Sequence, residues 1–299
     1  MFLRRPAILL ISLALAGCER ADAPEAVIGR AGRGPGEMAY PRAMASAPDG
    51  TFYVVDRAAR VQRFDAAGRP LNEWQMAEWA QGKPVGLTVG PDGNLWVPDT
   101  HYHRIIVFTP QGQELYRHGT RGQGDGQFDL PTDIAFDSAG NIYVSEYGEN
   151  NRVQVFDRDW KFIRSIGSFG RADGELARPQ SIAVLNDRLY VADACNHRIS
   201  VFTLDGVFER SLGRSGSGLG EYRFPYGLDV DRDNRLIVCE FGNNRVQKID
   251  PVTGKSFGAW GRNGRLPGEL AYPWAAVARP DGSVIVADAG NNRLQIIRF

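Results

Sequence analysis

The sequence predicts an all-β fold, a six-bladed β-propeller built of four-stranded blades. Three observations predict it: six units of nearly equal length, four strand-like runs in each unit, and a start of the chain that supplies a strand missing from the last unit. The composition agrees with this fold. Its 35 glycines among 299 residues suit a chain with many tight turns, and 43% apolar residues are enough for a packed core.

Two series of residues divide the chain into six units. The first is a proline that opens a strand and recurs every 43 to 48 residues, at Pro41, Pro84, Pro131, Pro179, Pro225 and Pro273. The second is an arginine with an acid four to six residues before it, in the pairs Asp56 and Arg60, Asp99 and Arg104, Glu146 and Arg152, Asp193 and Arg198, Glu240 and Arg245, and Asp288 and Arg293. A binding site needs asymmetry, whereas these positions recur in every unit. We therefore predict six structural ion pairs.

Each unit has the same internal order. In the third unit, a glycine-rich loop leads to the runs TDIAF, NIYVSE, RVQVF and KFIRSIG, which are separated by turns rich in Gly, Asp and Asn. Four strands in about 40 to 50 residues are typical of a propeller blade. Because no apolar run of helical period and length follows residue 26, alternation of strands and helices is excluded. The second unit lacks the glycine-rich loop at residues 79–84, so we expect a different loop there.

The two ends of the chain complement each other. The sixth unit stops at residues 294–299, which form its third strand, and residues 26–30 match residues 210–214 in position before a glycine-rich loop. We therefore predict that the amino-terminal strand completes the last blade and closes the ring. Such a closure removes two exposed sheet edges at once.

The repeated unit resembles the NHL repeat. The resemblance rests on the GxGxGE pattern at residues 32–37 and 216–221, on the strand-opening proline, and on VADAGNNRLQII at residues 286–297. It covers residues 27–299 and recurs in six copies. The resemblance implies an NHL-type six-bladed propeller over these residues.

The first residues of the chain indicate export. Arg4 and Arg5 precede ten uncharged apolar residues, which are too few to cross a membrane as a helix and are typical of a secretory signal. The sequence LAGC that ends at Cys18 resembles the lipobox of bacterial lipoproteins. We therefore predict a lipoprotein signal peptide at residues 1–17, lipidation of Cys18, and a short tether over residues 18–26. An ordinary signal peptide with an incidental cysteine is the alternative.

The predicted anchor places the protein in the bacterial cell envelope. Glu19 follows the lipidated cysteine, and by resemblance to enterobacterial sorting it favours the outer membrane, with the propeller facing the periplasm. The inner membrane stays open as the alternative. The 35 basic and 35 acidic residues balance, and this balance together with export argues against nucleic-acid binding.

A ligand-binding face is predicted where the six units differ. In a four-stranded blade, the glycine-rich loop and the turn between the second and third strands emerge on one face. The variable residues there are rich in aromatic, Arg and His side chains: Tyr40, Arg42, Gln180, Phe224, Tyr226, Tyr272, Trp274, His101, Tyr102, His103, Tyr147, His197 and Phe241. Because aromatic residues and Arg are typical of binding hot spots, we predict a monomeric, non-catalytic scaffold for a protein, peptide or envelope glycan. The alternative is that these residues only seal the loops.

An enzyme is the second hypothesis. NHL-like propellers include the peptidyl-α-hydroxyglycine amidating lyase, and this resemblance implies zinc held by histidines just after the strand-opening prolines. The residues at those positions here are Arg42, Val85, Thr132, Gln180, Tyr226 and Trp274, none of which is histidine. We therefore predict no cofactor and no catalytic residues. Asp133 and Asp229, on first strands, leave open a divalent ion in the central channel, as in lactonase-like propellers.

The remaining histidines and cysteines have local explanations. His103 and His197 directly precede two of the recurrent arginines, where other units have Asn, so we predict a turn role. Cys195 and Cys239 lie near the ends of second strands in neighbouring units. Whether they form a disulfide is left open, since the alternative is that both are small buried residues.

Overall fold

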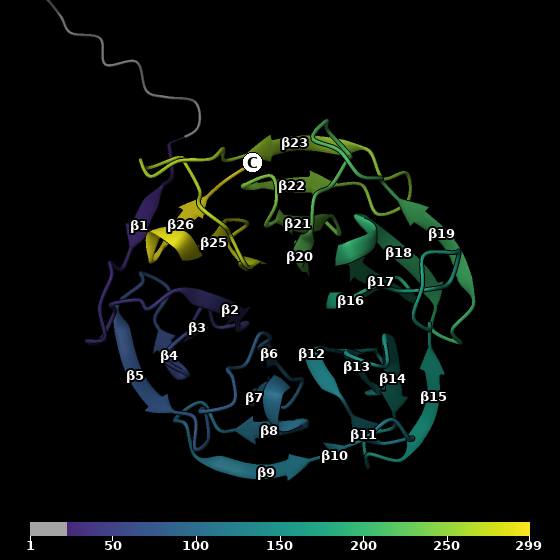
Figure 1. The fold of residues 1–299 in the computed structure, drawn as a ribbon. Coiled ribbons are helices and arrows are strands. Elements are labelled where there is room, and N and C mark those ends of the chain that lie inside the picture. Colours follow the sequence, from purple (N-terminus) through teal and green to yellow (C-terminus); the bar gives the residue numbers. More distant parts are fainter. Residues whose placement is uncertain (1–22) are drawn as a thin grey trace, which may run out of the picture.

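The computed structural model describes residues 23–299, so the predicted signal peptide and Cys18 lie outside the described residues. Six four-stranded antiparallel sheets stand around a central axis, which confirms the predicted propeller (Figure 1). Blade 1 consists of β2 Pro41–Ser46, β3 Phe52–Asp56, β4 Arg60–Phe64 and β5 Pro70–Gln75. Blade 2 consists of β6 Thr88–Val89, β7 Leu95–Asp99, β8 Arg104–Phe108 and β9 Glu114–His118. Blade 3 consists of β12 Leu130–Phe136, β13 Ile142–Tyr147, β14 Arg152–Phe156 and β15 Phe162–Ile166.

Blades 4 to 6 repeat this order. Blade 4 consists of β16 Pro179–Leu185, β17 Arg188–Asp193, β18 Arg198–Thr203 and β19 Phe208–Leu212. Blade 5 consists of β20 Pro225–Val230, β21 Leu236–Glu240, β22 Arg245–Ile249 and β23 Ser256–Trp260. Blade 6 consists of β24 Ala276–Ala278, β25 Val284–Asp288, β26 Arg293–Ile297 and β1 Ala26–Ile28. In each blade the first strand lies beside the axis and the last lies at the rim (Figure 1).

The ring closes through the amino-terminal strand, as predicted. Strand β1 pairs antiparallel with β26, with Ala26 opposite Ile296 and Ile28 opposite Leu294. The backbone N–H of Glu25 extends the pairing, since it donates to the carbonyl of Ile296 at 2.7 Å. In Figure 1 the purple strand β1 lies beside the yellow strand β26.

The core lies between the blades. Because each sheet buries both faces against its neighbours, apolar side chains of adjacent blades pack together. Phe52 and Val54 of blade 1, for example, share one cluster with Ile285 and Ala287 of blade 6. Second strands such as β3 and β7 are buried along their whole length, while rim strands such as β9 are largely exposed.

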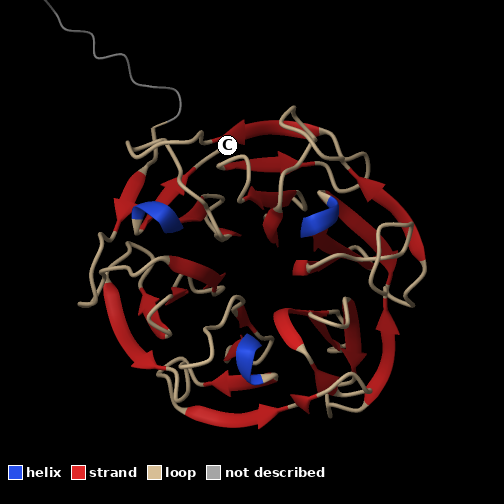
Figure 2. Ribbon diagram, in the orientation of Figure 1, coloured by secondary structure: helices blue, strands red, loops and turns tan. Residues whose placement is uncertain are grey.

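Short helices and short parallel β-pairings lie in the loops that connect the strands. One-turn helices η1 Thr100–Tyr102, η2 Ala194–Asn196 and η3 Ala289–Asn291 join the second and third strands of blades 2, 4 and 6 (Figure 2). In the glycine-rich loops, parallel β-bridges pair residues that are seven positions apart in the sequence. In the loop before blade 3 they form a short ladder of β10 Thr120–Arg121 with β11 Gln127–Phe128, and elsewhere they are single bridges such as Ala31 with Met38. Within residues 23–299 the second unit has no such contact, in line with its different loop. The same part of the chain contains no helix with the length and apolarity to cross a membrane.

Candidate ligand-binding face

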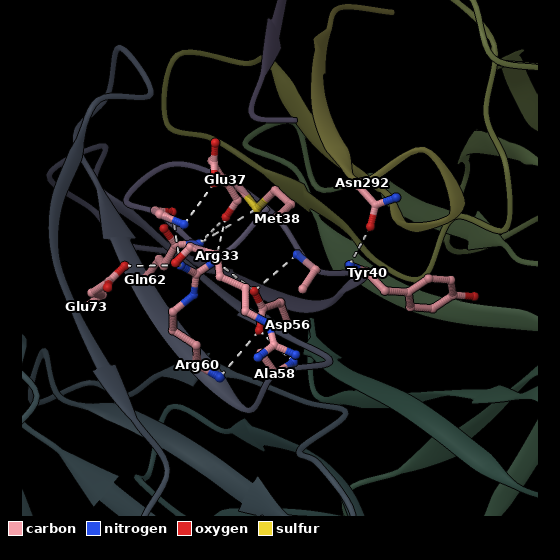
Figure 3. Close-up of polar contacts among 12 residues, drawn as sticks. Arg33, Glu37, Met38, Tyr40, Asp56, Ala58, Arg60, Gln62, Glu73 and Asn292 are labelled. Atoms are coloured by element: carbon pink, nitrogen blue, oxygen red, sulfur yellow. Dashed lines mark hydrogen bonds and ion pairs between the residues drawn. The ribbon is translucent and has the colours of Figure 1, made fainter. Parts of the chain in front are cut away.

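The recurrent acids and arginines tie each turn to a neighbouring loop. In all six blades the acid and the arginine form an ion pair, at N···O distances between 2.6 and 3.0 Å. In blade 1, Arg60 also donates to the carbonyls of Gly34 at 3.0 Å and Glu37 at 2.6 Å (Figure 3). Because the carboxylates are 0 to 1% exposed, each would be costly to bury without its partner. The pairs therefore hold the glycine-rich loop against the turn.

A buried glutamine that sequence analysis missed strengthens the same junction. It stands two residues after the arginine in four blades, at Gln62, Gln154, Gln247 and Gln295. In blade 5 the side-chain oxygen of Gln247 accepts from the N–H of Gly220 at 3.0 Å, and its amide donates to the carbonyl of Glu221 at 3.0 Å. Figure 3 shows Gln62 in the matching place in blade 1. The recurring Arg-x-Gln pattern was the signal that could have found these residues.

A second set of contacts joins blades 3, 4, 5 and 6 each to the next blade of the ring. The residue before the recurrent arginine accepts a hydrogen bond from the backbone N–H of the residue before the next proline. Asn292 accepts from Tyr40 at 2.9 Å (Figure 3), and Asn244 accepts from Tyr272 at 2.7 Å. His197 does the same through Nδ1, which accepts from the N–H of Phe224 at 3.1 Å. His197 has a φ of 57°, so it holds a left-handed turn position that Asn fills elsewhere.

The histidines of blades 2 and 4 serve these junctions. His103, with a φ of 58°, places Nδ1 against the carbonyl of Asp129 in the loop that enters blade 3. Burial lowers the pKa of His197, and the nearby Arg223 and Arg171 lower it further, which favours the neutral ring that accepts the bond. Burial likewise lowers the pKa of His101. The structure therefore gives His103 and His197 positions in blade junctions.

Five of the predicted face residues come together from three blades. Tyr226 and Phe241 of blade 5 stack with ring centroids 4.8 Å apart, and Trp274 of blade 6 meets them edge-on at 5.1 and 5.6 Å. Tyr272 lies 5.3 Å from Phe241, and Tyr40 of blade 1 lies 6.2 Å from Trp274. We call these five side chains the aromatic cluster.

Two arginines flank the aromatic cluster. The guanidinium of Arg42 lies 5.1 Å from the ring of Trp274, and that of Arg178 lies 5.3 Å from Tyr226 and 5.1 Å from Tyr147. Sequence analysis missed Arg178. It directly precedes Pro179, the position that Tyr40 and Tyr272 hold in other units, so a comparison of that position across the repeats was the available signal. Burial lowers the pKa of Arg42, as do the positive charges of Arg57 and Arg178.

The other predicted face residues lie outside the aromatic cluster. Phe224 packs against His197 with ring centroids 4.6 Å apart, and the hydroxyl of Tyr102 accepts from the N–H of Gln81 at 3.1 Å. Gln180 is buried, and its side-chain oxygen accepts from Nε of Arg178 at 3.3 Å. Phe224 and Tyr102 therefore contact a neighbouring turn and a neighbouring loop.

The aromatic cluster stands at one mouth of the central channel. The channel is a cavity of about 500 Å³ lined by the first strands of all six blades, and Tyr226 and Trp274 line it together with Gln180. Residues of the tight turns, such as Pro48 and Pro280, line the cavity too. Since those turns lie at the other end of the first strands, the cavity runs along the axis.

Two carboxyl groups lie within the channel, the buried one of Asp133 and the half-buried one of Asp229. Asp133 of blade 3 accepts from the hydroxyl of Ser181 at 2.6 Å and from the N–H of Ile182 at 3.0 Å, both in blade 4. Asp229 of blade 5 accepts from the N–H of Ala278 of blade 6 at 2.8 Å. Burial raises the pKa of each carboxyl to about 6. Both groups therefore link neighbouring blades.

The described residues do not fit a zinc site of the expected kind. Within residues 23–299 there is no group of three or more His, Cys, Asp and Glu side chains that could hold a metal. Asp133 and Asp229 supply two carboxyls, whereas protein zinc sites use at least three convergent ligands. Cys195 is exposed, Cys239 is buried, and both are free thiols.

Comparisons with known proteins agree with the architecture. A family described as a 6-bladed beta-propeller matches residues 171–253, and the NHL repeat matches residues 128–156. Peptidylglycine alpha-amidating monooxygenase of Rattus norvegicus is 34% identical over 126 residues, which cover 38% of this chain and 13% of that protein. NHL repeat-containing protein 3 of Homo sapiens is 34% identical over 79 residues, which cover 25% of this chain and 22% of that protein. The matched segments are thus small parts of these relatives.

A solved structure resembles the whole ring. The structure of a streptogramin B lyase superimposes with a TM-score of 0.64 and covers 90% of this chain and 96% of that one. At 17% sequence identity, the similarity concerns the fold alone. The six observed blades make the chain a six-bladed β-propeller, and one segment of it, residues 128–156, matches the NHL repeat.

Proposed function

We propose that this protein is a membrane-anchored, extracytoplasmic binding scaffold whose aromatic cluster receives a protein, peptide or glycan ligand. The observation that carries the proposal is the meeting of five aromatic side chains from blades 5, 6 and 1 at one mouth of the channel. These positions differ among the six units. Aromatic side chains offer a large contact area at a small entropic cost and are enriched in binding sites.

The junctions around the aromatic cluster support a preorganised face. Ion pairs, buried glutamines and links between blades fix the backbone on both sides of Tyr226 and Tyr272. A face that is ordered before binding loses less conformational entropy when the ligand arrives. The propeller therefore acts as a rigid support for a small, asymmetric site.

The anchor is part of the proposal. The LAGC sequence and the apolar stretch before it support lipidation of Cys18, with the outer membrane as the proposed location and the propeller in the periplasm. The Cys18→Ser variant should leave the membrane fraction. Retention of that variant in washed membranes would contradict the anchor.

Capture of a partner tests the binding face. We expect full-length protein in detergent to retain a partner from envelope extracts, and the double variant Tyr226→Ala and Trp274→Ala to lose it, because two anchoring rings are removed. Thermal unfolding shows whether the variant is folded, and the single variant Tyr272→Ala removes a ring that is 55% exposed. Phe257→Ala, which removes an exposed ring on the rim strand β23, is the matched control. A folded double variant that keeps every partner overturns the proposal.

A metal-dependent enzyme is the second candidate, either like an amidating lyase or like a lactonase. The name of a Caenorhabditis elegans relative, a probable peptidyl-alpha-hydroxyglycine alpha-amidating lyase that is 27% identical over 110 residues, favours the first. Against it stand the residues after the strand-opening prolines, which include no histidine. Metal analysis of the purified protein separates the two candidates. Stoichiometric zinc or calcium that survives dialysis supports the enzyme, and binding of a partner by metal-free protein supports the scaffold.

A further inference from the structure

We propose that the channel mouth binds a ring-bearing organic carboxylate, with the guanidinium groups of Arg42 and Arg178 meeting the carboxylate and the aromatic cluster packing on the ring. This inference rests on the proposed binding function and names the chemical class of the ligand. A sugar acid and an aromatic acid share this chemistry.

The charge state of Arg42 and Arg178 is the first argument. The six recurrent arginines each pair with an acid of their own blade. Within residues 23–299, Arg42 and Arg178 form no ion pair, and the hydrogen bond of Arg178 to Gln180 is to a neutral amide. Besides burial, the positive charges of Arg57 and Arg178 both lower the pKa of Arg42. An anion between them would relieve this repulsion.

Buried donors without partners are the second argument. Nε of Arg42 and Nε1 of Trp274 are both removed from solvent, and neither has a hydrogen-bond partner among the described residues. A buried N–H group without an acceptor is costly and rare in proteins. The two donors belong to side chains in contact, with the guanidinium 5.1 Å from the indole ring. An acceptor oxygen from a ligand would satisfy them.

The aromatic cluster is the reason for proposing a ligand that carries a ring. Tyr40 and Trp274 stand beside Arg42, while Tyr226 and Tyr147 stand beside Arg178, so each guanidinium has aromatic faces next to it. A small acid without a ring would leave those faces without a contact.

The two carboxyls of the channel favour a ligand with a single negative charge over one with two. Asp133 and Asp229 line the cavity that begins at Tyr226 and Trp274. Because like charges repel, they disfavour a doubly charged anion more strongly than a carboxylate. We therefore expect inorganic phosphate to bind more weakly than a carboxylate.

Titration calorimetry of the full-length protein in detergent tests the inference, with D-glucuronate and benzoate as probes. We expect at least one of these acids to bind, and D-glucose, N-acetylglycine and inorganic phosphate to bind at least about tenfold more weakly. The double variant Arg42→Gln and Arg178→Gln should lose about tenfold or more in affinity for the acid, since charge-assisted hydrogen bonds are removed. Binding of glucuronate alone or of benzoate alone supports the inference and names the source of the carboxylate.

A matched variant and several outcomes keep the test decisive. Arg121→Gln removes an exposed arginine in β10 and should leave the affinity unchanged. The single variants Arg42→Gln and Arg178→Gln serve if the double variant does not fold. The inference fails if neither acid binds, if phosphate or N-acetylglycine binds as tightly as the ring acids, or if folded arginine variants keep full affinity. Should these variants keep a captured partner that the aromatic variant loses, the binding face stands and the carboxylate is excluded.

Discussion

At the scale of single residues, the residues that recur in every blade stabilise the fold, whereas the residues that differ among the blades form the proposed binding face. Residues used in every blade, such as Asp193 and Arg198, hold the loops in place through an ion pair of 2.8 Å. Residues that differ, such as Trp274 and Arg178, gather at the mouth of the channel. Architecture needs the same contact six times, whereas a ligand without sixfold symmetry needs different contacts.

The buried glutamine gives a prediction at this scale. Gln247→Leu leaves the N–H of Gly220 and the carbonyl of Glu221 without their partner, which should lower the free energy of unfolding by about 1 to 3 kcal/mol. Urea unfolding measures the loss. Gln113→Leu, at an exposed turn position, is the matched control and should change stability by less than about 0.5 kcal/mol. Equal stability of the two variants would show that the loop does not depend on this side chain.

At the scale of elements, the ring is held by one strand that comes from the other end of the chain. Strand β1 has three residues, two of them exposed, yet it covers the edge of β26. Its neighbourhood is strengthened by an ion pair of 2.8 Å between Glu25 and Arg298. The closing strand therefore contributes mainly through backbone pairing, and not through a large buried surface.

Deletion of residues 24–30 from the full-length chain tests the closure. The deletion exposes the edge of β26 and removes Ile28 from the cluster shared by blades 6 and 1, so we expect the thermal midpoint to fall by about 10 °C or more. Val27→Ser changes an exposed side chain of the same strand, keeps the pairing, and should leave the midpoint within about 2 °C. An unchanged midpoint after the deletion would refute the closure.

At the scale of the whole molecule, the channel combines six first strands into one cavity with unequal ends. Arg42 and Arg178, which form no ion pair within residues 23–299, lie beside the aromatic cluster at one mouth, and the interior carries Asp133 and Asp229. These carboxyls join blade 3 to blade 4 and blade 5 to blade 6. Both carboxyls therefore take part in contacts between blades.

The two carboxyls predict a dependence of stability on pH. Their pKa is about 6 in the folded protein and near 3.8 when unfolded, so the folded state binds more protons between these values. The free energy of unfolding from these groups therefore falls as pH rises from about 4 to 7, by about 2 to 3 kcal/mol for each. Asp133→Asn and Asp229→Asn remove this loss, so the double variant should gain stability relative to the wild type as pH rises.

Urea unfolding at pH 4 and pH 7 measures this difference. Asp159→Asn, which changes an exposed carboxyl in a turn, is the control and should follow the wild type at both pH values. A stability difference between the wild type and the double variant that stays constant with pH contradicts the assignment.

Much of this protein was determined by its sequence alone. The spacing of the prolines predicted six blades, and the match between residues 26–30 and 210–214 predicted the closing strand. Both predictions were possible because a repeated unit can be recognised by comparing segments of the sequence with one another. Only the tertiary structure decided which variable residues meet. Arg178 belongs to blade 4 and Tyr226 to blade 5, and their contact follows from the curvature of the ring. Blade order is a property of the repeat, whereas a site shared among blades depends on how side chains of different blades converge on one axis.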